Sequence, residues 1–324
     1  MVNHSRQYRD GAVAALDFPL DQISEHVVKR GDFVWYDLVK PRPEDLQVLA
    51  TELGLHHLAV EDAIHGRQRP KVDHYDNHLF INLYQARMFR GTDDIETSEL
   101  GIFVTKNAMI TVRKDTKFDM HSVVNRWDEA APLAKNGVAF LLWALLDQVI
   151  DGYFEVIEKL DERLELLEDI LFGEERKDIA IQRKTYDLRK SLVLLRRAAV
   201  PMREVINPLL KHNGDILHND MMPYYQDLYD HTMRVADWTE SLRDLVTTLL
   251  ETHLTIQSNR MNMVMKKVTS WAAIIAVPTA ITGFYGQNVP YPGFSNVWGF
   301  WTSTIAIIVI SGALYFGFKK RDWL

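Results

Sequence analysis

The most apolar part of the chain is its C-terminal block, residues 268–318, which contains no Asp, Glu, Lys, Arg or His. A polar, turn-forming segment at 285–293 divides this block into two halves. Each half is long enough to cross the hydrocarbon core of a bilayer, which needs about 17–25 apolar residues. The pattern therefore predicts a helical membrane hairpin, with spans at 268–285 and 297–318, a loop at 286–296 and a tail at 319–324.

Apolar residues also recur at helical spacing upstream of the first span. Between Tyr224 and Val277 the chain has no Gly and no Pro, and no stop signal separates the polar part from the span. A helix over this stretch would be about 80 Å long at 1.5 Å per residue. We expect one continuous helix, in which residues 223–267 form a stalk between a soluble domain and the membrane.

The soluble part, residues 31–222, begins with a mixed pattern and becomes helical after Thr116. Runs rich in β-branched and aromatic residues predict strands, and Pro43 opens the first of two short helices. The expected strands are 33–38, 71–75, 78–84, 100–105 and 108–112, and the second short helix is 58–64. This order predicts an α+β domain with an antiparallel or mixed sheet. Residues 1–30 are polar and give no clear pattern.

Two helices of opposite charge follow the predicted sheet. The first ends at Gly173 and the second spans about 179–206, and each has an apolar seam at spacings of four and three. These seams are Tyr153, Ile157, Leu160, Leu164, Leu167 and Leu171, then Leu188, Leu192, Leu195, Ala199, Met202 and Ile206. The other positions are mainly acidic in the first helix and basic in the second, which favours an antiparallel hairpin. The acidic face is either a cation-attracting surface or a solvated face paired with its neighbour.

Composition and flanking charge limit the function and orient the hairpin. The chain has 324 residues, a formal net charge of −7 and no cysteine, which excludes thiolate chemistry and argues against nucleic acid as a partner. The N-terminus has no apolar signal-peptide core. Basic residues flank the spans only at the ends away from the loop, at 266–267 before the first span and 319–321 after the second. The positive-inside rule therefore places both termini in the cytoplasm and the loop outside.

Two spanning helices per chain cannot enclose a pore, so a conducting protein of this kind must form a ring in which one helix of each copy lines the lumen. The first span is the better candidate, because small or weakly polar residues recur along one of its faces. Together with Met265 these are Asn262, Thr269, Ala272, Ala276, Thr279 and Gly283. The alternative is a face for helix packing in the membrane, where small residues are also common. The second span has no such stripe and suits a lipid-facing ring.

The loop residues Gly286, Gln287 and Asn288 follow the candidate lining helix directly. Gly permits a tight bend, and a ring of Asn oxygens and backbone carbonyls is a neutral acceptor surface. Such a surface suits an ion that keeps its water shell, and Mg²⁺ is the biological cation that dehydrates most reluctantly. The alternative is an ordinary turn, because Gly and Asn dominate turns.

From Phe33 to its end, the chain resembles the CorA family of magnesium transporters. The matching segments are 55–62, 69–72, 225–231, 258–266, 281–288 and 319–324. The resemblance implies a homopentameric, funnel-shaped channel whose first span lines the pore. It also implies that the Gly-Xaa-Asn signature binds the hydrated ion at the outer mouth. Two departures stand out: Gln287 replaces the usual Met of the signature, and residues 289–296 lack the acidic residues common in family loops.

The resemblance also implies regulation by divalent ions that bind between neighbouring cytoplasmic domains and hold the channel shut. One carboxylate would come from the start of the long helix, where Asp227 stands. Its partner would come from the loop before the predicted strand 100–105. Asp93 and Asp94 lie in this loop, but neither aligns clearly with the family's carboxylate. A separate group, His56, Glu61, Asp62 and His65, lacks the His-Glu-Xaa-Xaa-His arrangement of zinc proteases, so we expect no enzyme activity.

The sequence and the resemblance together predict a potential-driven membrane channel for divalent cations, with Mg²⁺ as the transported ion and Co²⁺ or Ni²⁺ as surrogates. The resemblance implies that Mg²⁺ is also the regulatory ion and that the chain forms a pentamer in the cell membrane. We expect no organic cofactor, since no nucleotide-binding loop is visible. Two other functions stay open. One is a zinc or proton-coupled transporter on the same fold, and the other is a two-span receptor that signals through the stalk.

Overall fold

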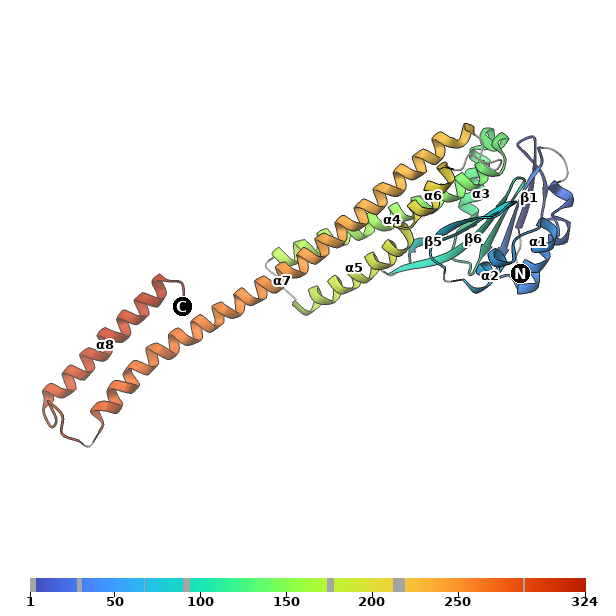
Figure 1. Cartoon of the computed structure of the whole chain (residues 1–324). Helices are drawn as coiled ribbons and strands as arrows, with labels where there is room; N and C mark the ends of the chain where they lie inside the picture. The colour runs from blue at the N-terminus through green and yellow to red at the C-terminus, as the bar shows by residue number, and fades with distance from the viewer. Residues whose placement is uncertain are drawn as a thin grey trace. The chain divides into compact units, whose positions relative to one another are not determined.

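A computed structural model describes residues 4–27, 31–66, 68–89, 94–173, 178–211, 219–287 and 289–324 (Figure 1). The chain divides into two compact units, Met1–Thr247 and Thr248–Leu324. The first unit contains a β-sheet with helices on it, and the second contains a pair of long apolar helices. The long helix α7, Met222–Tyr285, belongs to both units.

The first unit is built on a seven-stranded sheet in the order β2-β1-β3-β7-β6-β5-β4. Its strands β3 and β7 pair in parallel, and the other neighbours pair antiparallel. The sheet is therefore mixed, and the α+β prediction is confirmed. The strands are β1 His4–Arg9, β2 Ala12–Leu16, β3 Phe33–Val39, β4 Lys71–His74, β5 His78–Met88, β6 Ile95–Thr105 and β7 Ala108–Arg113.

The polar N-terminal segment supplies two of these strands, for which the residue pattern gave no prediction. The feature of the sequence that indicates these strands is the Asp-Gly turn between them. Asp10 and Gly11 join β1 to β2 with φ of 51° and 80°, the left-handed conformation of two-residue hairpins. Strand β1 then pairs with β3, and Tyr8 stacks on Phe33 at 4.8 Å between ring centroids. The segment thus forms one edge of the sheet.

Strands β5 and β6 extend beyond the predicted 78–84 and 100–105. Their ladder continues to the pair Met88–Ile95 and includes Arg87 opposite Glu96, which form an ion pair. Polar cross-strand pairs stabilise a ladder as apolar ones do. Apolar runs alone therefore predict both strands as too short.

Helices cover both faces of the sheet. On one face, α1 (Pro43–Leu53) and α2 (His57–His65) pack into a core whose members from the sheet include Val34, Phe80 and Ile110. On the other, Trp35 meets Trp127 of α3 (Met120–Glu129) edge to face at 4.8 Å. Successive residues of β3 point to opposite faces, so Val34 and Trp35 lie in different layers.

The helical hairpin consists of α4, Val138–Phe172, and α5, Asp178–Ala199. The predicted seam of α4 is fully buried, from Tyr153 to Leu171. The predicted single helix at 179–206 is wrong, because α5 ends at Ala199 and α6 spans Met202–Lys211. The break lies at Pro201, which has no N–H to donate and disfavours helical geometry at Val200.

The second unit is a hairpin of the C-terminal part of α7 and helix α8, Val297–Lys320. The prediction of one uninterrupted helix is confirmed, since α7 has 64 residues and continues through Pro278. Both helices are long and apolar enough to cross a membrane. Short 3₁₀ turns complete the structure at Leu20–Gln22, Glu25–Val27, Ala131–Asn136 and Asn219–Met221.

Candidate ion pathway and metal sites

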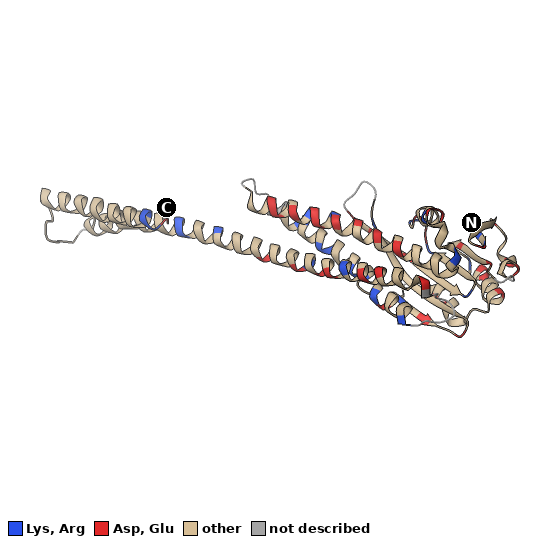
Figure 2. Ribbon diagram, turned by 90° about the horizontal axis from the view of Figure 1, so that it is seen from above, with Lys and Arg blue, Asp and Glu red and all other residues tan. Residues whose placement is uncertain are grey.

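One face of the apolar part of α7 is shielded from solvent, and α8 is the helix that lies beside this part of α7 (Figures 1 and 2). Ser270 is fully buried, and Ala273, Ile274, Val277 and Ile281 are half-buried at spacings of three and four. This spacing marks one stripe of a helix with 3.6 residues per turn. Most of the residues on this face are apolar, so the fit between the two helices depends on the shapes of their side chains.

The predicted pore-lining residues lie on a different face of α7. All seven are exposed in the chain: Asn262, Met265, Thr269, Ala272, Ala276, Thr279 and Gly283. At about 100° per residue, the mean direction of this stripe differs from that of the face toward α8 by about 130°. A Cβ placed on Gly283 would meet no atom within 4 Å. The stripe is therefore not the surface that holds the hairpin together.

Positive charge gathers at one end of this hairpin. Lys266 lies over the ring of Trp323 at 5.8 Å, and Trp323 stacks on Phe318 at 5.7 Å between ring centroids. Lys319 lies 5.9 Å from the ring of Tyr315 on its own helix. In Figure 2 the blue positions of this unit lie near the C-terminus, and the rest of the two apolar helices is tan. The charged end and the uncharged loop are thus at opposite ends of the hairpin.

The loop end is held by backbone contacts and aromatic rings. The N–H of Gly286 donates to the carbonyl of Thr282 at 2.8 Å, and the Tyr291 hydroxyl donates to the carbonyl of Tyr285 at 2.9 Å. Tyr291 also packs edge to face on Tyr285 and Phe294, at 5.0 and 5.4 Å between ring centroids. Gly286 and Gln287 are exposed, whereas Asn288 lies outside the described residues. These contacts fold the loop back onto the end of α7.

Asp227 lies in the first turns of α7, and its side chain is 63% exposed. Its Oδ1 is 3.7 Å from Nε2 of His231, one turn later. Nearby, burial raises the pKa of Asp147 on α4, against the opposing effect of Arg126, and Asp151 and Asp227 raise it further. His231 and Asp147 were not singled out from the sequence, although His231 stands four residues after Asp227 and so on the same helix face.

Asp94 lies in a different part of the first unit. It lines a cavity of about 240 Å³ with Arg163, Ile170 and Lys184, near the far end of α4. Asp227 instead lies near Asp147, and the helical rise from residue 147 to 163 is about 24 Å. Asp93 is outside the described residues. One chain therefore does not bring Asp227 and Asp94 together.

The side chains of His56, Asp62 and His65, in and beside α2, have structural partners. His56 accepts the N–H of Leu58 at 3.3 Å and caps the helix, while Asp62 pairs with Lys71 at 2.6 Å. The ring of His65 contacts the carbonyl of Glu61 at 3.0 Å. Across the described residues, no group of three His, Asp or Glu side chains is arranged to hold a metal ion.

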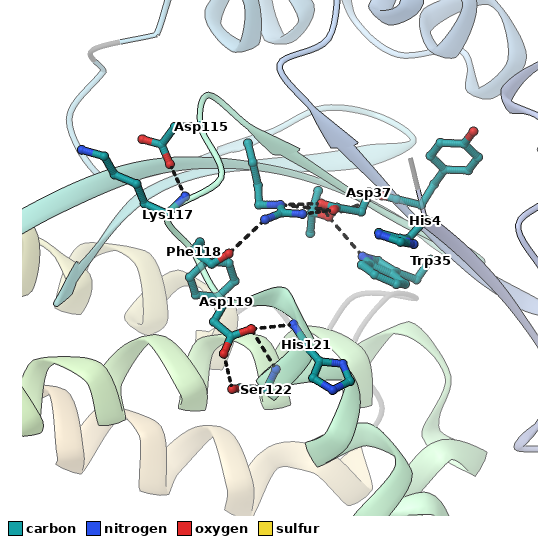
Figure 3. Close-up of polar contacts among 12 residues, drawn as sticks. His4, Trp35, Asp37, Asp115, Lys117, Phe118, Asp119, His121 and Ser122 are labelled. Atoms are coloured by element: carbon teal, nitrogen blue, oxygen red, sulfur yellow. Dashed lines mark hydrogen bonds and ion pairs between the residues drawn. The ribbon is translucent and has the colours of Figure 1, made fainter. Parts of the chain in front are cut away.

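A cavity of about 740 Å³ opens where β7 ends and α3 begins. Four cations line it, but each has a carboxylate partner: Arg6 with Asp128, Arg87 and Lys117 with Glu96, and Arg113 with Asp37. Figure 3 shows Asp119 bonded to His121 and Ser122, which caps α3. The charges of this cavity are thus already neutralised, and we assign it no ligand.

Comparison with known proteins gives one consistent result. Residues 30–320 match the family described as CorA-like Mg²⁺ transporter protein. The cobalt/magnesium transport protein CorA of Thermotoga maritima is 32% identical over 286 residues, which cover 87% of this chain and 81% of that protein. The protein of the same name from Methanocaldococcus jannaschii is 27% identical over 321 residues, or 98% of each chain.

The complete structure of the CorA magnesium transporter from Methanocaldococcus jannaschii has the same fold, with a TM-score of 0.78. The alignment covers 100% of this chain and 99% of that one at 24% identity. The α+β domain, the long helix and the two apolar C-terminal helices are therefore shared architecture, and their order matches the prediction. The chain belongs to the CorA family of Mg²⁺ transporter proteins.

Proposed function

We propose that this chain is the subunit of a homopentameric membrane channel that conducts Mg²⁺, with Co²⁺ and Ni²⁺ as surrogates. The proposal follows the family, whose relatives are named for cobalt and magnesium transport. Two apolar helices per chain cannot enclose a lumen, so a conducting form requires several copies. We take the number of five copies from the resemblance to the family.

The observation that carries this proposal is the exposed stripe of α7 from Asn262 to Gly283. It is free of charge and formed largely of small or weakly polar side chains, and α8 packs on another face. A ring of five such stripes would give a narrow, neutral lumen that passes an ion without binding it tightly. Large apolar residues such as Trp271 and Ile275, which are 51% and 62% exposed, would then face lipid or neighbouring helices.

Ion capture at the outer mouth would depend on Gly286, Gln287 and Asn288. The assignment of Asn288 rests on the sequence motif and the family resemblance. No carboxylate occurs in residues 289–296, so amide and carbonyl oxygens would have to bind the water shell of the ion. Mg²⁺ suits this chemistry because it keeps its waters, which donate hydrogen bonds to neutral acceptors.

In the membrane, both termini would be cytoplasmic, because the basic residues lie at the end of the hairpin away from the loop. The membrane potential would then drive cations inward with about 2.3 kcal/mol per charge per 100 mV. Closure would follow when internal Mg²⁺ binds between cytoplasmic domains. Asp227 of one copy would meet Asp93 or Asp94 of the next, since a single chain keeps Asp227 and Asp94 apart.

An ion panel in proteoliposomes tests this function. We expect Mg²⁺ uptake by the purified chain, competition by Co²⁺ and Ni²⁺, and no requirement for a proton gradient. Uptake of Zn²⁺ without Mg²⁺, or uptake that stops when the proton gradient is collapsed, would instead support a different transporter on this fold. A well-folded oligomer that carries no ion would support a membrane sensor.

The outer site is tested by Asn288→Ala. We expect this variant to assemble normally and to lose Mg²⁺ uptake, because the ring would lose five side-chain oxygens. Asn296→Ala is the matched control, since Asn296 lies at the start of α8 in the same loop. Unchanged uptake in Asn288→Ala would remove this residue from ion capture.

A further inference from the structure

Helices α4 and α5 carry two exposed ridges of opposite charge. The acidic ridge of α4 consists of Glu155, Glu162, Leu166 and Asp169, and the basic ridge of α5 consists of Arg183, Tyr186, Lys190 and Arg197. In both ridges the charged residues recur every seven positions. Leu166 is 61% exposed and Tyr186 is 69% exposed, so each ridge also offers a large apolar surface to solvent.

The two ridges do not neutralise each other within the chain. The charged members of each ridge lie opposite the buried seam of its helix, such as Leu160 in α4 and Leu188 in α5, so these charges face away from the hairpin. Leu166 is exposed as well and borders the cavity that α4 shares with α5. Within the described part of the chain, no ion pair reaches Glu155, Asp169, Arg183, Lys190 or Arg197. Glu162 contacts only Lys159 on its own helix among these residues, at 2.8 Å.

The members of the two ridges lie at matching positions along the common axis of the hairpin, and we call this position the height of a residue. The Tyr153 hydroxyl lies 3.4 Å from the carbonyl of Ala198, and Arg163 and Ile170 of α4 line one cavity with Lys184 of α5. These contacts set the level of α4 relative to α5 to within about one helical turn, or 5.4 Å. Because the helices run antiparallel, each step forward along α4 matches a step back along α5. Four pairs therefore share a level: Glu155 with Arg197, Glu162 with Lys190, Leu166 with Tyr186, and Asp169 with Arg183.

This matching matters in a ring. Helix α4 runs beside the first part of α7, as contacts of Tyr225 with Ala139 and of His231 with Phe154 show (Figure 1). We take the first part of α7, which lies in the same unit as α4 and α5, to run along the symmetry axis of the proposed ring, which makes α4 and α5 run roughly along that axis as well. Rotation about the axis leaves the position of a residue along the axis unchanged. Where the acidic ridge of one copy faces the basic ridge of the next, all four pairs would therefore be aligned.

We propose that the acidic ridge of α4 docks on the basic ridge of α5 from a neighbouring copy of this chain. The contact joins two different surfaces, which is the type of interface that closes a ring. It would bury Leu166 against Tyr186 between three charge pairs, so charge would set the register and the apolar pair would exclude water. The proposal rests on the ring of the proposed function and adds the surfaces that join its cytoplasmic domains.

Disulfide trapping tests the contact directly, because the chain has no cysteine of its own. A tagged full-length chain with Leu166→Cys is mixed during expression with an untagged chain that carries Tyr186→Cys. We expect oxidation to give a linked heterodimer on a non-reducing gel. Leu166→Cys with Val193→Cys is the matched control, since Val193 is also exposed on α5 but lies about 10 Å away in height.

Charge reversal provides the second measurement. With Glu162→Lys in the Leu166→Cys chain, we expect the crosslinking rate to fall about fivefold, as expected for loss of about 1 kcal/mol. Adding Lys190→Glu to the Tyr186→Cys chain restores the rate, which a merely unfolded variant would not do. An assembled, conducting oligomer with no crosslink above the Val193 control would overturn this interface and leave the channel intact. A chain that forms no oligomer would instead overturn the proposed function itself.

Discussion

Two substitutions of the same type, three residues apart on α7, separate the proposed lumen from the packing face. Ala276 lies on the exposed stripe, and Ala273 is half-buried against α8. Each is changed to Leu, so size and polarity change equally. We expect Ala276→Leu to block Mg²⁺ uptake and to leave stability unchanged, and we expect Ala273→Leu to do the reverse.

The expected size of each effect follows from geometry. A Leu side chain reaches about 2.5 Å farther than Ala, so five copies at 276 would narrow the lumen by about 5 Å. A hydrated Mg²⁺ is about 7 Å across, from a metal–oxygen distance near 2.1 Å plus the radius of water. At 273 the added carbons would meet α8, and overpacking of this kind costs about 1–3 kcal/mol.

Mg²⁺ uptake into proteoliposomes and thermal denaturation in detergent measure the two effects on the same preparations. Uptake is compared at equal amounts of assembled oligomer, so that poor assembly is not mistaken for block. Two results would contradict this assignment: equal conduction by both variants, or block of uptake by Ala273→Leu while Ala276→Leu conducts normally. Either result would mean that the exposed stripe does not line the ion pathway.

Three further changes test the first unit. Asp37→Asn should lower stability by about 3–5 kcal/mol, because it leaves the buried charge of Arg113 without its partner, and thermal unfolding measures the loss. Burial lowers the pKa of His78 to about 4, so the unfolded chain binds a proton below about pH 6.5 that the folded chain refuses. Stability should therefore fall by about 3 kcal/mol between pH 6.5 and 4, and His78→Phe should remove this part of the fall. Asp227→Ala should raise Mg²⁺ uptake at high internal Mg²⁺, measured in loaded vesicles.

Each of these changes has a matched control. Asp244→Asn breaks an exposed pair with Arg243, so its cost should stay below about 1 kcal/mol. His57 is exposed beside the same aromatic stack, and His57→Phe should leave the pH dependence intact. Asp230→Ala removes a neighbouring exposed carboxylate and should leave uptake unchanged. Equal behaviour of a variant and its control would contradict the corresponding assignment.

The sequence predicts the long elements of this fold well, because their signals are strong. The stretch without Gly or Pro after Tyr224 corresponds to α7, and the block without charge at 268–318 corresponds to the end of α7 and to α8. The buried seam of α4 follows from its spacing in the same way. These features depend on many residues at once, so no single side chain changes the prediction.

Shorter features depend on single residues and were harder to predict. Pro201 divides a seam whose apolar spacing continues through it, and Asp10-Gly11 joins two strands in a polar segment. Spacing alone reports which face is buried and does not report where the backbone can turn. The conformational limits of Pro and Gly would have located both changes of direction.

The sequence predicts which face of α7 carries the candidate site, but it does not predict how several copies of the chain would complete that site. The helical spacing of the small residues on α7 places them on one stripe, and the fold keeps that stripe clear of α8. Closing a lumen, or joining Asp227 to a second carboxylate, requires residues from another copy. The pattern within one chain cannot determine such contacts, because they depend on the symmetry of the proposed ring.

Mg²⁺ uptake by the purified full-length chain under a clamped membrane potential tests the central claim most directly. A divalent ion gains about 4.6 kcal/mol per 100 mV, so its accumulation at equilibrium should rise about tenfold for each 30 mV of inside-negative potential. We expect this dependence, with no need for nucleotide or a proton gradient. Uptake no greater than that of protein-free vesicles, or uptake that does not respond to the potential, would contradict it.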